Sequence, residues 1–225
     1  MTKYFSILIV LFFPAAMNGQ VTHSLGITAG ISNVFYKSDI KGNKNFVSIF
    51  SPTISAEYSK HNDNVFWGGA GFGFTLRQVP FYVFPTGQKA GMNIAEIWLR
   101  ARAGLKIERS FTTHLPYLSL GFAHHADRES FIKDGNSSFT YLNNLDSNYT
   151  ATNFHPFIEI GNKIINSTFR DEKRNVSFTY ALRYYPVALF KSPIQFEYDF
   201  QQYKTVQYHI IEFSIIAGLQ RNFHK

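Results

Sequence analysis

The sequence predicts an all-β protein, namely one eight-stranded antiparallel transmembrane up-and-down β-barrel with a lumen filled by side chains. Three observations predict this fold. Apolar and polar residues alternate with a period of two along most of the chain, as they do where successive strand side chains point to opposite faces. The alternating segments are long, and the connections between them are short and long in turn. Aromatic residues make up 17% of the 225 residues and cysteine is absent, which excludes a disulfide scaffold and a disordered tail.

The first twenty residues differ in composition from the rest of the chain. Lys3 precedes the apolar run FSILIVLFF at residues 5–13, and small residues follow as far as Gly19 and Gln20. This is the arrangement of a secretory signal peptide, and the run is too short to cross ~30 Å of hydrocarbon as a helix. We therefore expect residues 1–20 to be a cleaved signal peptide and residues 21–225 to form the barrel domain. An exported chain without cysteine fits a bacterial envelope better than a small animal secreted domain, which usually relies on disulfides.

Eight segments carry the alternation, and each is expected to form one strand. In residues 97–107 the odd positions are Ile, Leu or Ala, whereas the even positions include Trp98, Arg100 and Arg102. Many segments are longer than the roughly 5–6 residues usual in soluble sheets, and a tilted membrane strand needs about 9–11 residues to cross. The expected strands are residues 23–36, 46–60, 64–79, 92–109, 115–126, 152–166, 175–188 and 206–223.

The connections predict which end of the barrel faces which side of the membrane. Long connections are expected at residues 37–45, 80–91, 127–151 and 189–205, and short ones near residues 61–63, 110–114 and 167–174. Short turns at one end and long loops at the other are typical of outer-membrane barrels, whose termini are periplasmic. Residues 131–141 and 192–202 alternate by themselves, and we expect them to project beyond the membrane as hairpins. If both reached the membrane instead, ten strands would result.

The polar faces of the strands indicate that they line the lumen. They carry five acidic and six basic residues, a near balance that favours mutual pairing inside the barrel over a solvated outer face. An arginine facing lipid at the midplane would cost about 2–4 kcal/mol. Because an eight-stranded barrel is just wide enough to be filled by side chains, we expect no open pore. The expected lumen charge network is Glu57, Arg77, Glu96, Arg100, Arg102, Lys106, Glu108, Glu159, Lys163, Arg183 and Glu212.

The glycine-rich third segment and the last segment, FSIIAGLQRNF, resemble small bacterial outer-membrane β-barrel proteins. The similarity is to the OmpA/OmpX-like superfamily and in particular to barrels common in Bacteroidetes, and it covers nearly all of the mature chain. It implies a monomeric barrel in contact with outer-membrane lipid and lipopolysaccharide and inserted by the barrel-assembly machinery. The family's assembly signal is an alternating apolar strand that closes on an aromatic residue. Phe213, Leu219 and Phe223 match it, although the chain continues through His224 and Lys225.

The sequence predicts a structural, adhesion, assembly or secretion-accessory role, with a possible place in an envelope protein complex and no cofactor. No catalytic residue or metal ligand is predicted, and His124 and His125 should point to opposite faces of their strand. The net charge of +7 fits anionic headgroups, because an exported barrel does not meet nucleic acid. Two alternatives stay open. One is a rim-sited lipid-modifying hydrolase that uses residues such as His125, Ser119 and Glu129, and the other is a soluble secreted barrel that binds a hydrophobic ligand.

Overall fold

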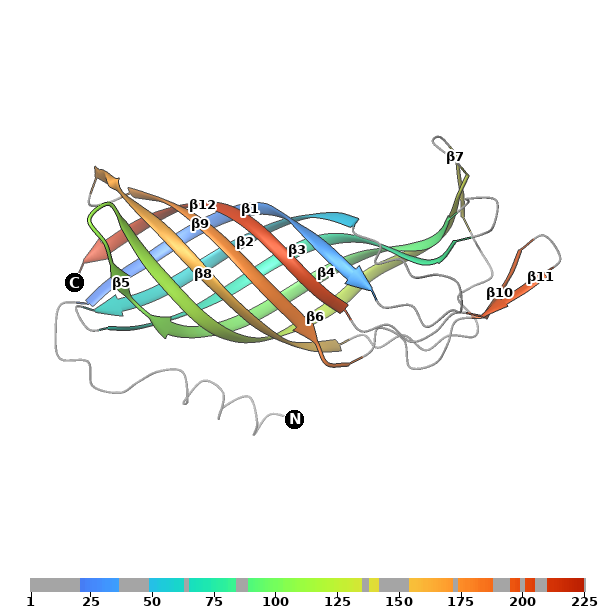
Figure 1. Cartoon of the computed structure of the whole chain (residues 1–225), viewed down its shortest axis with the longest axis horizontal. Coiled ribbons are helices and arrows are strands. Elements are labelled where there is room, and N and C mark those ends of the chain that lie inside the picture. Colours follow the sequence, from blue (N-terminus) through green and yellow to red (C-terminus); the bar gives the residue numbers. More distant parts are fainter. Residues whose placement is uncertain are drawn as a thin grey trace.

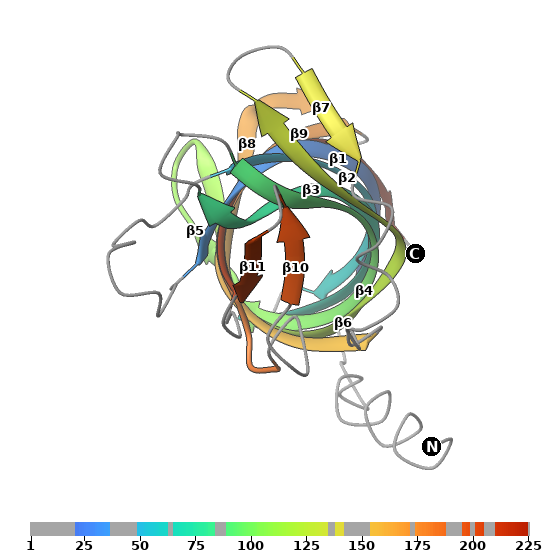
Figure 2. The ribbon, with the colours of Figure 1, turned by 90° about the vertical axis from the view of Figure 1, so that its right-hand side faces the viewer.

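Eight long strands form a closed antiparallel barrel (Figures 1 and 2). The computed structural model describes residues 21–36, 49–62, 65–83, 89–134, 138–141, 154–171, 174–187, 195–198, 201–204 and 210–224, so the expected signal peptide lies outside the described residues. The barrel strands are β1 (Val21–Tyr36), β2 (Ile49–Asn62), β3 (Phe66–Val83), β4 (Lys89–Leu105), β6 (Thr112–Asp134), β8 (Phe154–Asp171), β9 (Arg174–Tyr185) and β12 (Ile210–His224).

The barrel has up-and-down topology. Each strand pairs antiparallel with the next barrel strand along the chain, from β1–β2 to β9–β12, and β1 pairs with β12 to close the sheet. Closure removes the unpaired edges that an open sheet would present. The two-residue strand β5 (Ile107–Glu108) follows β4 and pairs with the start of β6. The predicted eight-stranded antiparallel fold is therefore confirmed.

Three short strands lie outside the closed barrel. The strand β7 (Ser138–Tyr141) pairs with the distal end of β6, and β10 (Gln195–Tyr198) pairs with β11 (Gln201–Lys204) in a separate two-stranded sheet. Figure 1 shows all three at the end of the barrel opposite the C-terminus. Both alternating loop stretches thus form hairpins, as expected, and neither adds a strand to the barrel wall. The ten-stranded alternative is wrong.

Side chains alternate between an apolar outer wall and a polar lumen. On β9, Phe178 and Leu182 are 44% and 47% exposed, whereas Thr179 and Arg183 on the opposite face are 2% and 4% exposed. The outer wall also carries Leu99, Leu105 and Phe213, which are exposed, while Arg100 and Glu212 are buried. A soluble ligand-binding barrel has the reverse arrangement, with apolar residues inside. The structure therefore argues against the soluble alternative and supports a transmembrane barrel with a filled lumen.

No helix in the described part of the chain is long and apolar enough to cross a membrane.

Candidate functional site: a charge network in the barrel lumen

Nine of the eleven predicted network residues lie buried in the lumen, and each is at most 4% exposed. They come from six strands, because the period-two alternation points every second side chain of each strand inward. The structure brings all nine into one continuous set of ion pairs. The set contains four carboxylates and five cations: Glu57, Glu96, Glu159, Glu212, Arg77, Arg100, Arg102, Arg183 and Lys163.

Glu57 on β2 binds three cations at one end of this network. Its Oε2 atom lies 2.7 Å from Nη2 of Arg102 and 3.2 Å from Nζ of Lys163. Its Oε1 atom lies 2.5 Å from Nη2 of Arg100. Three cations around a single carboxylate leave a local excess of positive charge. Glu159 offsets it, because Arg100 pairs with Glu159 as well as with Glu57.

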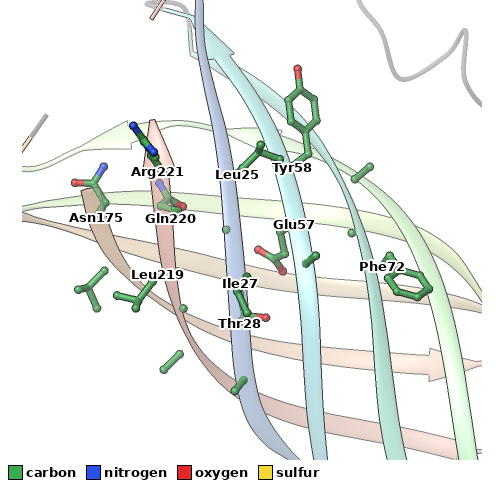
Figure 3. Close-up of a pocket in the computed structure, with 18 of the residues that line it drawn as sticks. Leu25, Ile27, Thr28, Glu57, Tyr58, Phe72, Asn175, Leu219, Gln220 and Arg221 are labelled. Carbon is green, nitrogen blue, oxygen red and sulfur yellow. The ribbon is translucent and has the colours of Figure 1, made fainter. Parts of the chain in front are cut away.

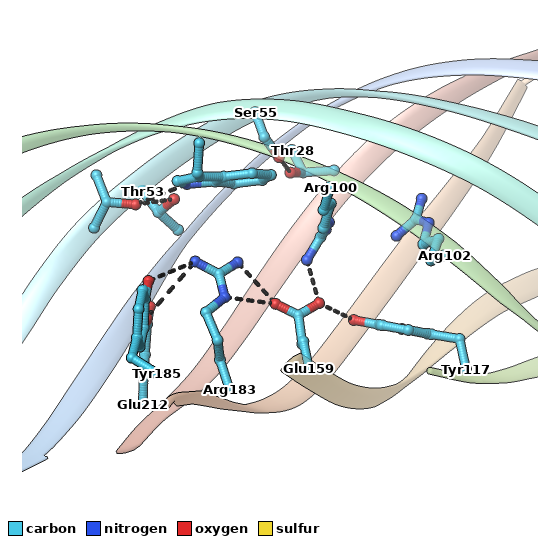
Figure 4. A network of polar contacts seen from close by, with 12 residues as sticks. Thr28, Thr53, Ser55, Arg100, Arg102, Tyr117, Glu159, Arg183, Tyr185 and Glu212 are labelled. Atoms are coloured by element: carbon cyan, nitrogen blue, oxygen red, sulfur yellow. Dashed lines mark hydrogen bonds and ion pairs between the residues drawn. The ribbon is translucent and has the colours of Figure 1, made fainter. Parts of the chain in front are cut away.

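Glu159 on β8 occupies the centre of the network (Figure 4). One carboxylate oxygen accepts hydrogen bonds from Arg100 and from the hydroxyl of Tyr117, the latter at 2.9 Å. The other oxygen accepts from Nε and Nη2 of Arg183 at 2.9 and 2.7 Å. This two-pronged arginine contact is among the stronger hydrogen-bonding arrangements in proteins. Glu159 therefore joins β4, β6 and β9 across the lumen.

Arg77 on β3 completes the network toward the end that carries the long loops. Its Nη2 atom lies 2.8 Å from Oε1 of Glu96 and 2.6 Å from Oε2 of Glu212. The same atom donates to the hydroxyl of Tyr185 at 2.6 Å, and that hydroxyl donates to Glu96 at 3.1 Å. Arg183 Nη1 lies 3.7 Å from Glu212 and links this group to Glu159.

Aromatic rings stack on the guanidinium groups and fill the space between them. Arg183 lies 4.2 Å from the ring centre of Phe157 and 5.0 Å from that of Trp98, and Arg100 lies 4.9 Å from that of Trp98. Arg102 is similarly placed over Trp67, at 5.1 Å. Such cation–π contacts strengthen when desolvated. The lumen aromatics Trp67, Trp98, Phe157 and Tyr185 are at most 3% exposed, so the rings and the charges together fill the barrel.

Two predicted network residues, Lys106 and Glu108, do not join the buried network, so this part of the prediction is wrong. Nζ of Lys106 pairs with Oε1 of Glu108 at 2.7 Å, and the Glu108 side chain is 68% exposed. The reason is local. Both residues lie beyond the end of β4 at Leu105, at the barrel end, where the side chains of Lys106 and Glu108 are 18% and 68% exposed. The pair belongs to the short turn at the barrel end.

Several network members were not predicted as such. Tyr117 and Tyr185 bind the carboxylates, and His125 lies with Nε2 3.5 Å from Oε2 of Glu96 while its ring stacks on His155 at 4.5 Å. All four occupy inward positions of their strands, and all are at most 6% exposed. The period-two alternation places Tyr185 inward as well as the charges, and applying it to the other polar aromatic residues identifies Tyr117, His125 and His155.

The adjacent His124 points to the outer wall, where its ring lies 4.8 Å from that of Phe154, as predicted for neighbours on one strand.

The geometry does not support a Ser–His pair for hydrolysis. Ser119 and His125 both point inward from β6, but they are six residues apart on one strand, or about 20 Å. A nucleophile and its base need hydrogen-bond contact. Among the described residues there is also no group of three or more His, Asp, Glu or Cys side chains that could hold a metal ion. The side chain of Glu129 lies outside the described part.

The three residues of the predicted assembly signal lie together on the outer face of β12. Phe213, Leu219 and Phe223 are 37%, 70% and 42% exposed, so each is accessible from the lipid side. Their role in assembly stays a prediction.

Comparison with known proteins gives the fold. No protein-family model matches the chain, and no curated protein does. A major outer membrane protein from Thermus thermophilus is 11% identical, with a TM-score of 0.50 and coverage of 90% of this chain and 99% of that one. Neisserial surface protein A is 12% identical (TM-score 0.44, coverage 88% and 97%), and the attachment invasion locus protein of Yersinia pestis is 12% identical (TM-score 0.42, coverage 92% and 100%). At sequence identities this low, the similarity is evidence about the fold alone. The chain has the fold of the small outer-membrane β-barrels, with an apolar outer wall and a charged lumen filled by side chains.

Proposed function

We propose that the protein is an integral barrel of a bacterial outer membrane that acts as a structural, adhesive or assembly-accessory component and does not conduct as an open pore. The observation that carries the proposal is the distribution of side chains. Large apolar residues cover the outer wall, and ion-paired residues that are almost fully buried occupy the lumen. Only a lipid environment makes this arrangement favourable, because an aqueous one would expose the apolar wall.

The lumen contacts support a closed barrel. The ion pairs run from Arg102 on β4 through Glu159 on β8 to Arg77 on β3, so they bridge strands across the interior. Aromatic rings occupy the intervening space. Opening a path for hydrated ions would require buried charges to separate, which is strongly unfavourable in a low-dielectric interior.

The extensions beyond the barrel support a role in contact with other molecules. The β6–β7 and β10–β11 hairpins lie past the end of the barrel that carries the long loops (Figure 1). Loops held by a rigid scaffold are common binding elements. We propose that this end faces the cell exterior, that the outer wall contacts lipid and lipopolysaccharide, and that the barrel-assembly machinery inserts the chain as a monomer.

Fractionation and conductance together test this proposal. We expect the protein in the outer-membrane fraction, released only by detergent, and we expect purified protein to give no large, stable conductance steps in planar bilayers. A variant with Trp98, Arg100 and Arg183 all changed to Ala removes part of the plug and should show steps, which checks that the assay detects an open barrel. Recovery in the detergent-free soluble fraction would overturn the membrane location, and large steps from the wild type would overturn the closed lumen.

A further inference from the structure

The outer wall of the barrel is hollowed into an apolar groove near the end that carries the short turns (Figure 3). The groove has a volume of about 1320 Å³ and is lined by residues of β1, β2, β3, β4, β9 and β12. Four alanines form its floor: Ala29 lies opposite Ala217, Ala56 opposite the larger Ile27, and Ala70 opposite the larger Tyr58. Larger residues rise around this floor, and Leu219 is 70% exposed. A flexible acyl chain can adapt to an apolar groove of this volume.

Arg174 and Arg221 lie at one end of the groove, and neither has an ion pair among the side chains that the structure describes; the side chain of Asp171, opposite Arg174 on β8, lies outside that part. Arg174 on β9 is directly opposite Arg221 on β12, and both side chains are exposed on the outer wall. Directly opposed residues have Cβ atoms about 4.5–5.5 Å apart, and like charges at this position destabilise a sheet. The Arg221 guanidinium lies 5.4 Å from the ring centre of Phe223 on its own strand, which helps to hold it at the wall. An anion bound between the two guanidinium groups would remove their repulsion.

We propose that the groove binds one anionic phospholipid, with its phosphate between Arg174 and Arg221 and an acyl chain along the alanine floor. The proposal rests on the membrane location proposed above. Arginine binds phosphate oxygens through two parallel hydrogen bonds, and basic residues at a membrane interface attract anionic headgroups. The strand register places the arginine pair next to the apolar part of the groove, because Arg221 lies opposite Leu25 and Leu25 lies opposite Tyr58. One lipid molecule can therefore contact the arginines with its headgroup and the apolar part with its acyl chain.

The position of the arginines relative to the short turns indicates which membrane leaflet contains the bound lipid. Arg174 begins β9 directly after a short connection, at the barrel end that we predict to be periplasmic. The bound lipid would therefore belong to the leaflet on that side.

Native mass spectrometry of the detergent-solubilised protein tests the site. Phosphatidylglycerol and phosphatidylcholine with identical acyl chains are titrated in parallel, so that only the headgroup differs. We expect one molecule of phosphatidylglycerol to be retained in preference to phosphatidylcholine. The double variant Arg174→Gln and Arg221→Gln should bind phosphatidylglycerol about tenfold more weakly, because two charge-assisted contacts are lost. Ala56→Phe, which fills the floor, should weaken binding of both lipids.

Arg109→Gln is the matched control. Arg109 is exposed in the short turn at the same end of the barrel but does not line the groove, so its loss changes the net charge without changing the site. Equal retention of the two lipids, unchanged binding by the double variant, or an equal loss in the Arg109 control would overturn the proposal. Because the measurement is made in detergent, it is separate from the fractionation that tests the membrane location.

Discussion

Glycine at two positions lets aromatic rings cross the lumen close to a strand. A Cβ atom added to Gly73 on β3 would lie 2.3 Å from Cζ2 of Trp98, and one added to Gly121 on β6 would lie 2.2 Å from Cζ of Phe157. These distances are far shorter than van der Waals contact, so no larger residue fits without moving a ring. The glycine-rich third segment of the sequence thus has a steric reason, since Trp98 also stacks on Arg100 and Arg183 in the network.

Replacing Gly73 by Ala should destabilise the barrel. The added methyl group collides with a rigid ring held by its neighbours, and overpacking of this kind typically costs about 1–3 kcal/mol. The free energy of unfolding, measured by urea titration in lipid vesicles, checks the change. Gly71→Ala is the matched control on the same strand, because its Cβ would lie 3.2 Å from Nε of Arg100, a flexible side chain that can shift. Equal losses in both variants would contradict the steric explanation.

Replacing Glu159 by Gln should have a larger effect. The change leaves Arg100 and Arg183 buried without their shared carboxylate, and loss of one partner of a buried ion pair costs about 3–5 kcal/mol. The same urea titration measures it. Glu108→Gln breaks the exposed pair with Lys106 and should cost less than about 1 kcal/mol. If the two substitutions had similar effects, the lumen network would not contribute to stability as its burial indicates.

At the scale of elements, the alternation predicted which segments form strands better than where they end. The expected third and fifth strands stop at residues 79 and 126, whereas β3 continues to Val83 and β6 to Asp134. Both expected ends coincide with register shifts. On β3 the shift lies between Pro80 and Tyr82, and on β6 it lies between His125 and Asp127, which pair with Glu96 and Ala95. A bulge inserts one extra residue and reverses the phase of the alternation. The sequence signal therefore stopped at each bulge while backbone pairing continued.

Removing the β10–β11 hairpin should leave the barrel intact. These strands pair with each other and, within the described chain, with no barrel strand, so replacing residues 195–204 by a short Gly-Ser linker removes no barrel ladder. We expect the variant to keep the slower, heat-modifiable migration of a folded barrel on SDS gels. Ile215→Pro in β12 is the contrasting variant, because it removes a backbone donor within the β1–β12 seam and should prevent folding. A deletion that abolished folding would mean that the hairpin stabilises the barrel.

At the scale of the whole molecule, the alternation predicted that charges face inward but not which charges meet. Arg77 pairs with Glu212, which is 135 residues away in sequence. Strand stagger in a tilted barrel determines which inward residues lie at the same height, and the sequence does not reveal this stagger. The residue set of the network was therefore largely predictable, whereas its pairing order and the contacts of Tyr117, Tyr185 and His125 required the structure.

The absence of cysteine from the chain permits a test of orientation and of the lumen together, because any introduced thiol is the only one present. Ser138→Cys places a thiol in β7 at the long-loop end, Ser110→Cys places one in a short turn, and Ser119→Cys places one in the lumen, where Ser119 is 0% exposed. A membrane-impermeant maleimide added to intact cells should label position 138 only. After lysis it should also label position 110, but not position 119 until the barrel is denatured.

The reverse order for positions 138 and 110 would place the termini outside the cell. Labelling at position 119 in the folded barrel would show that water and solutes pass between the side chains that fill the lumen.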